Sequence, residues 1–129
     1  MSERGAPLQI ARMLVDEQHF SASKNLVKSR AFLPGFYQDV YSTSTFDVDG
    51  LSRDDIWELG RAKVALPRNK TLYGHAELRA ADVLGVGLAV VRSEPPERHC
   101  DIVQWPAEKE DRMSVAQELA RVAQLVLRR

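Results

Sequence analysis

The order of hydrophobic patterns along the chain constrains its fold more than any single motif does. The segments DVYSTSTFDV and TLYGHAELRA each alternate between two faces, which is typical of β-strands. A capped helical pattern separates them, and a long amphipathic pattern follows later in the sequence. Strands, helix, strands and a long helix in this order predict an α+β domain. We expect an antiparallel or mixed sheet, with the capped middle helix and the long C-terminal helix packed mainly on one face.

The two helices carry clear end signals. Ser52 is a suitable N-cap for the middle helix, and Asp55, three residues later, completes a capping-box pattern. Gly60 is expected to end or bend this helix. The long helix is expected over residues 106–129, because Pro106 is tolerated near a helix start and two arginines close the pattern.

The size and composition of the chain fit one domain. It has 129 residues, of which 44% are hydrophobic and 28% are charged. This is enough apolar material for a core that needs no disulfides. We expect residues 1–7 to form a flexible leader and residues 8–129 to form a single α+β domain.

Composition also bears on several function classes. The single cysteine, Cys100, excludes an internal disulfide and a cysteine-rich zinc site, and strand alternation places it on an inward face. Arg12, Asp16 and Glu17 interrupt the N-terminal apolar stretch, so a secretory signal peptide is not indicated. No apolar run approaches the roughly 20 residues that a membrane span requires. We therefore expect a cytoplasmic protein that does not enter a membrane.

Two histidines and two carboxylates form the most specific chemical hypothesis. His75 and Glu77 share one face of an expected strand, and His99 and Asp101 share one face of another. If these strands are neighbours, the four side chains converge on a site suited to Zn, Mn or Fe, which would activate water for hydrolysis. The alternative is two ordinary cross-strand pairs on a solvated face. The sequence leaves the adjacency of the strands open, and no other cofactor is predicted.

Basic residues suggest a second hypothesis, nucleic-acid binding. Two stretches with nearby aromatic rings could hold phosphates and stack on bases if they converge. Their members are Lys24, Lys28 and Arg30, then Arg61, Lys63, Arg68 and Lys70, with Phe32, Phe36 and Tyr37 nearby. Eighteen basic residues balance 18 acidic ones, which favours a mixed-charge surface but leaves a local patch open.

Large aromatic residues suggest a protein interface. Trp57, Tyr73 and Trp105 are of the types that dominate binding hot spots. The C-terminal helical pattern is apolar over more than the usual arc, which suits packing on a second copy or another protein. The alternative is that all of these residues belong to the core.

Three segments resemble those of small uncharacterised bacterial proteins of unknown function. They are LSRDDIWELG, TLYGHAELRAADV and PPERHCDIVQWPAEKE, and the resemblance covers Asp39 to Arg129. It implies a bacterial cytoplasmic context and brings no activity or site residue with it.

No catalytic motif stands out, so the sequence favours a non-enzymatic role and leaves enzymatic activity open. We expect a binding or accessory module that acts through protein–protein contacts and forms a homo-oligomer or binds a protein partner. One alternative is a small metal-dependent hydrolase with the two-histidine, two-carboxylate site. The other is a weak nucleic-acid-binding protein.

Overall fold

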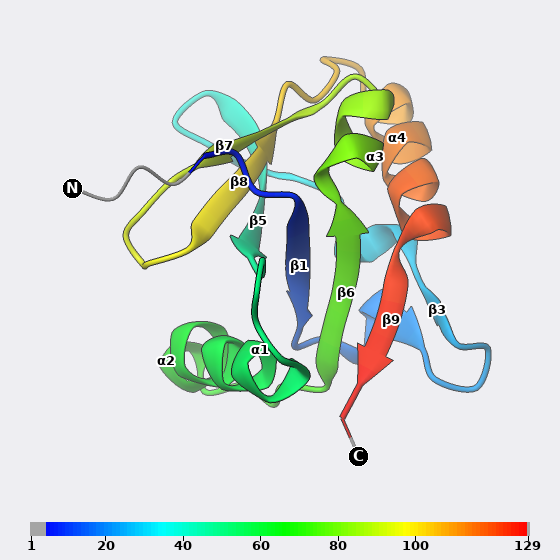
Figure 1. Cartoon of the computed structure of the whole chain (residues 1–129). Helices are drawn as coiled ribbons and strands as arrows, with labels where there is room; N and C mark the ends of the chain where they lie inside the picture. Colours follow the sequence, from blue (N-terminus) through cyan, green and yellow to red (C-terminus); the bar gives the residue numbers. More distant parts are fainter. Residues whose placement is uncertain (1–4, 129) are drawn as a thin grey trace.

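The computed structural model of the chain describes residues 5–128, which are arranged around an antiparallel sheet (Figure 1). The strand order is β7-β8-β5-β1-β6-β9, and β4 pairs with the remaining part of β5. The strands of this sheet are β1 (Gln9–Leu14), β4 (Gly35–Tyr37), β5 (Val40–Asp47), β6 (Gly74–Arg79), β7 (Ala89–Arg92), β8 (His99–Val103) and β9 (Gln124–Leu127). A separate two-stranded sheet pairs β2 (Phe20–Ser21) with β3 (Leu26–Val27).

Helices cover both faces of the large sheet. They are η1 (Glu17–His19), η2 (Ser29–Ala31), α1 (Arg53–Gly60), the π-helical segment η3 (Arg61–Ala65), α2 (Leu66–Arg68), α3 (Ala80–Gly85) and α4 (Lys109–Val122). In Figure 1, α3 and α4 lie at the upper right and α1 and α2 at the lower left. The expected α+β class, with a middle helix and a long C-terminal helix, is confirmed. The two helices pack on opposite faces of the sheet.

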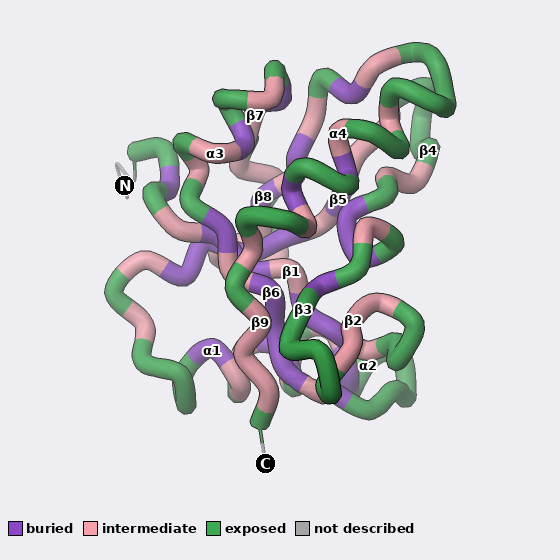
Figure 2. Tube along the Cα trace, turned by 90° about the vertical axis from the view of Figure 1, so that its right-hand side faces the viewer, coloured by how far each residue is buried: buried purple, intermediate pink, exposed green. Residues whose placement is uncertain are grey.

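Burial of β1 on both sides explains this two-faced arrangement. Ile10 and Leu14 belong to the core cluster that includes Leu119 of α4. Ala11 and Met13 belong to a second cluster, with residues of α1 and η3. A strand covered on both faces needs apolar residues at successive positions, so this segment shows no clear alternation in the sequence. Figure 2 shows the buried residues gathered in the central strands.

The middle helix begins as its sequence indicates. The Ser52 side chain accepts a hydrogen bond from the Asp55 backbone N–H at 3.1 Å, and the Asp55 carboxylate accepts one from the Ser52 N–H at 3.5 Å. Gly60 does not end the helical stretch, which continues through η3 and α2. The stretch ends at Asn69, which caps it in the left-handed conformation with φ 54°. A Cβ atom at Gly60 would lie 2.7 Å from the sulfur of Met13, so glycine lets the helix approach the sheet.

The C-terminal helix is shorter than its sequence pattern predicts. It ends at Val122, Ala123 is extended, and the next four residues form β9 beside β6. Without β9 this edge of β6 would be unpaired, and the leucine and valine side chains of β9 suit a half-buried strand. The pairing of β6 therefore overrides the helical pattern.

The N-terminal segment is held against the sheet through Asp47 and Arg92. The buried Asp47 carboxylate accepts a hydrogen bond from Arg92 at 2.8 Å, and Arg92 also donates to the carbonyl of Gly5. Burial acts to raise the pKa of Asp47, but the hydrogen bonds from Arg92 and the Asp49 N–H and the charges of Arg92 and Arg98 lower it overall. Of the predicted leader, residues 1–4 lie outside the described residues. Within residues 5–128 no helix is long and apolar enough to span a membrane.

Gly74 provides a test of the β6–β9 pairing. A Cβ atom there would lie 2.1 Å from the carbonyl oxygen of Val126 and 2.8 Å from the Cα of Leu127. We expect Gly74→Ala to displace β9 and to lower the free energy of unfolding by about 1–3 kcal/mol. The matched control is Gly85→Ala in α3, where no atom lies within 4 Å of the new Cβ, and we expect a gain of about 0.5–1 kcal/mol. Urea denaturation measures both, and equal effects would contradict the close approach of β9.

Candidate functional site

The four proposed metal ligands are not brought together. His75 and Glu77 lie on β6, whereas His99 and Asp101 lie on β8. Strands β1 and β5 separate β6 from β8, so the two pairs are about 14 Å apart or more at the usual spacing of about 4.8 Å between strands. Among residues 5–128 there is no group of three or more His, Cys, Asp or Glu side chains that could hold a metal ion. The condition that the sequence left open is therefore not met.

His75 and Glu77 form a local pair beneath α1. The Nε2 atom of His75 lies 3.1 Å from Glu77 Oε1, and His75 is only 4% exposed. Burial lowers the pKa of His75, and the Glu77 hydrogen bond acts in the opposite direction. With Arg53, Trp57 and other residues, His75 lines a cavity of about 240 Å³ between α1, β6 and β9. The face expected to be solvated is thus covered by a helix.

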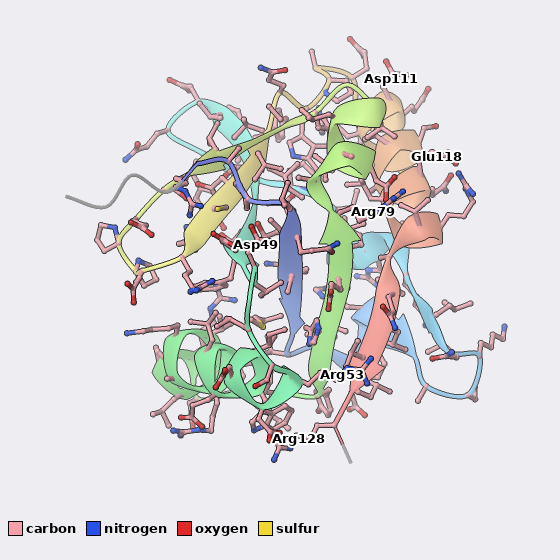
Figure 3. All side chains as sticks on the ribbon, in the orientation of Figure 1. Asp49, Arg53, Arg79, Asp111, Glu118 and Arg128 are labelled. Carbon is pink, nitrogen blue, oxygen red and sulfur yellow. The ribbon has the colours of Figure 1, made fainter. Side chains whose placement is uncertain are left out.

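The three aromatic residues proposed for a protein interface lie in different surroundings. Trp57 is half-buried, and the guanidinium of Arg128 lies 4.9 Å from its ring centre. Figure 3 shows Arg128 at the same end of the molecule as Arg53, which is the first residue of α1. Tyr73 is half-buried beside Phe20, at 5.6 Å between ring centres. Trp105 is buried in the core, and its indole N–H donates a hydrogen bond to a carbonyl of β8.

A different site lies where the sheet divides. Strands β1 and β5 pair at Ile10–Asp47 and Ala11–Phe46, with a further hydrogen bond from the Val48 N–H to the Gln9 carbonyl, and the pairing stops at Arg12. Arg12 fills the gap: its Nε donates to the carbonyl of Ala31 at 2.8 Å, and its Nη1 donates to the carbonyl of Ser44 at 3.0 Å. The side chain thus joins the two halves of the sheet through backbone acceptors.

Arg12 carries a poorly solvated positive charge without a negative partner. Burial lowers its pKa to about 10, and the charge of Arg68 lowers it as well, while Tyr37 acts in the opposite direction. Within the described part of the chain Arg12 forms no ion pair with a carboxylate. A charge that is partly withdrawn from water is more costly when it is unpaired, so the guanidinium of the half-buried Arg12 is suited to an anion.

Arg12 opens into a cavity lined by further cations. The cavity has a volume of about 190 Å³ and is walled by residues of β1, β5, β8, η3, α2 and the β7–β8 connection. Its lining residues are Arg12, Met13, Ser44, Phe46, Lys63, Val64, Arg68, Pro96 and His99. No aspartate or glutamate is among them. We call this space the Arg12 cavity.

The Arg12 cavity offers several groups for holding an anion. Lys63 and Arg68 are exposed and form no ion pair with any residue that the structure describes. Ser44 supplies a hydroxyl group. His99 is oriented by a contact of 2.7 Å between its Nδ1 and the Ser93 hydroxyl, and its ring packs edge-on against Phe46 at 5.2 Å. Two charged side chains, a hydroxyl and an imidazole therefore line the cavity together with the half-buried Arg12.

Local structure explains how these side chains meet. Ser44 and Phe46 point to the same face of β5, and Phe46 is opposite His99 on β8. Lys63 lies in the π-helical segment η3, which widens the helical turn, and Arg68 lies in the short α2 that follows. Of the residues expected to bind nucleic acid, Lys63 and Arg68 line the cavity, whereas Arg61 pairs with Glu58.

The central residue of this site, Arg12, was missed by the sequence-based reasoning. One signal was present: Arg12 is the single charged residue within the apolar segment LQIARMLV. A charged side chain inside a buried strand requires a specific partner, and that requirement identifies Arg12 as unusual. Cys100, expected to face inward, is buried as predicted, and burial raises the pKa of its thiol.

The buried His75 predicts a pH dependence of stability. Because its pKa is lower in the folded chain than the usual value near 6.5, the unfolded chain takes up a proton first as the pH falls through 6.5. We expect stability to decrease between about pH 7.5 and 5.5, above the range in which most carboxyl groups titrate. His75→Gln should flatten this decrease in urea denaturation. His19→Gln, at a side chain that is 19% rather than 5% exposed, should flatten it less, and an unchanged slope in His75→Gln would contradict the assignment.

Comparison with known proteins identified no matching family model, no matching curated protein and no matching solved structure. The resemblance to small bacterial proteins therefore stays a prediction. The Arg12 cavity is interpreted from its own chemistry.

Proposed function

We propose that this protein is a non-enzymatic binding module that holds an anionic group of its ligand, a phosphate or a carboxylate, in the Arg12 cavity. The observation that carries the proposal is the guanidinium of the half-buried Arg12, which has two backbone acceptors and no carboxylate partner among the described residues. An anion in the cavity would supply the missing negative charge.

The donor geometry and the fixed position of Arg12 favour an anionic ligand. A guanidinium presents a fixed set of donors that match the oxygens of phosphate and carboxylate groups. Arg12 is already fixed by Ala31 and Ser44, so little side-chain entropy is lost when an anion binds. Lys63 and Arg68 add charge at the mouth, where solvent weakens each contribution.

The volume of the Arg12 cavity limits what enters it. About 190 Å³ corresponds to roughly six water molecules at about 30 Å³ each. This is smaller than the pockets of about 300–1,000 Å³ that enclose drug-sized ligands. The cavity therefore suits one charged group, and the rest of a larger ligand would lie outside it.

In this proposal the protein is cytoplasmic and acts together with a second copy of itself or with another protein. Met113 and Val122 on α4 are 43% and 40% exposed, and they are the apolar side chains of that helix available for such contacts. The metal-dependent hydrolase receives no support from the geometry, because its four ligands are divided between β6 and β8.

Anion titration tests the proposal. Inorganic phosphate and acetate are titrated against the protein by isothermal calorimetry, and the shift in melting temperature is recorded in parallel. The double variant Lys63→Gln, Arg68→Gln changes two exposed side chains and should leave the fold intact. We expect it to weaken phosphate binding about tenfold or more, which corresponds to about 1.4 kcal/mol.

Arg61→Gln is the matched control. Arg61 lies in the same helical stretch, is exposed and is paired with Glu58 outside the cavity. It should bind phosphate like the unchanged protein. Binding that is absent in the unchanged protein, or equally weakened in the control, would overturn the proposal.

A further inference from the structure

A surface track leads away from the Arg12 cavity along β5. Val40, Ser42 and Ser44 alternate with inward residues and point to the same face as Phe46 and the cavity. Val40 is 50% exposed, and the two serines are half-buried. Four residues of strand at about 3.3 Å each place Val40 about 13 Å from Ser44. The track therefore extends well beyond the cavity and carries hydroxyl groups.

An exposed aromatic ring lies at the far end of this track. Tyr37 is opposite Val40 in the β4–β5 hairpin, shares its face and is 69% exposed. Its ring lies over Gly35, where a Cβ atom would be 2.5 Å from the tyrosine Cε2. Tyr37 is also close enough to Arg12 to affect the guanidinium electrostatically. In Figure 1 the hairpin is at one end of β5 and α2 lies toward the other.

Phe36, the neighbouring aromatic residue, points to the other face. It is opposite Tyr41, and the two ring centres are 4.6 Å apart. The guanidinium of Arg112 covers the Tyr41 ring at 3.9 Å. Phe36 therefore packs on Tyr41, on the face of the hairpin that Arg112 of α4 reaches, whereas Tyr37 lies on the face of the track.

Additional cations surround the end of β1 near the cavity. The charges of Arg30 in η2 and Lys70 after α2 both contribute to lowering the pKa of Asp16. Burial is the largest cause of the lowered pKa of His19, and the charges of Arg12 and Arg30 lower it further. Arg30 and Lys70, one from each basic stretch, thus both lie near the Asp16 carboxylate. A cationic cavity beside an exposed ring is the combination by which proteins hold single strands: phosphates in a positive groove and bases stacked on aromatic side chains.

We propose that the anionic group in the Arg12 cavity is a phosphate of a single-stranded nucleic acid, which follows β5 to Tyr37 and stacks a base on its ring. This inference rests on the proposed anion binding. Because Ser42 and Ser44 lie between the hairpin and the cavity on one face of β5, the track can hold more than one nucleotide.

Fluorescence anisotropy with a labelled oligouridylate of about twelve nucleotides tests the inference, within the usual site sizes of single-strand binders. We expect Tyr37→Ala to weaken binding about 5- to 150-fold and Tyr37→Phe, which keeps the ring, to bind normally. Phe36→Ala is the matched control on the opposite face of the same hairpin and should have little effect. Affinity should fall with salt, and the Lys63→Gln, Arg68→Gln variant should reduce the slope of log affinity against log salt by about 1.4.

The outcomes separate this inference from the anion-binding proposal. If inorganic phosphate binds but Tyr37→Ala leaves oligouridylate binding unchanged, the nucleic-acid inference is overturned and the anion site stands. The same conclusion follows if inorganic polyphosphate of equal charge binds as tightly as the oligonucleotide. If neither phosphate nor oligonucleotide binds, both proposals fail.

Discussion

The short pairing of β1 with β5 is the constraint on which the candidate site depends. The strand pairing between β1 and β5 covers two residue pairs, Ile10–Asp47 and Ala11–Phe46, and one more backbone hydrogen bond runs from the Val48 N–H to the Gln9 carbonyl. Beyond them the backbone groups of β5 need other partners, and the carbonyl of Ser44 finds one in Arg12. A longer pairing would have closed the gap and left no room for the guanidinium. The Arg12 cavity is therefore a consequence of where this pairing stops.

The separation of β1 from β5 also explains why Arg12 connects several elements. Its donors reach η2 through Ala31 and β5 through Ser44, while its own backbone belongs to β1. The helical stretch from α1 to α2 then covers the gap, because Gly60 permits a close approach to Met13. A structural role and the proposed ligand-binding role fall on the same side chain, so substitution of Arg12 would affect both at once. Exposed residues at the mouth separate them better.

Local signals in the sequence predicted local structure well. The Ser52–Asp55 capping box needs only four consecutive residues, and the two faces of β6 follow from simple alternation. Features set by distant residues were not predictable in this way. Residues 124–127 continue a helical pattern and become a strand only because β6 offers an edge. His75 was expected on a solvated face and is buried because α1 covers that face.

The candidate site was only partly predictable, for the same reason. Lys63 and Arg68 were recognised as basic, and His99 as chemically capable, but nothing in the sequence joined them to Arg12. Their convergence depends on strand order and on the point where two strands diverge. These are properties of the whole sheet. A charged residue within an apolar segment is the signal that sequence reasoning could have used.

The uneven placement of charge has a consequence for how the molecule meets its surroundings. The chain has no net charge at neutral pH, yet the lining of the Arg12 cavity includes cations and no acid. The compensating acids lie elsewhere, among them Asp111 on α4, at the end of the molecule away from α2 (Figure 3). The electric field inside the cavity is therefore positive although the whole chain is neutral, and such a local field favours an anionic group there. Net charge alone therefore does not describe the electrostatics of this chain, because one cavity can be cationic in a neutral protein.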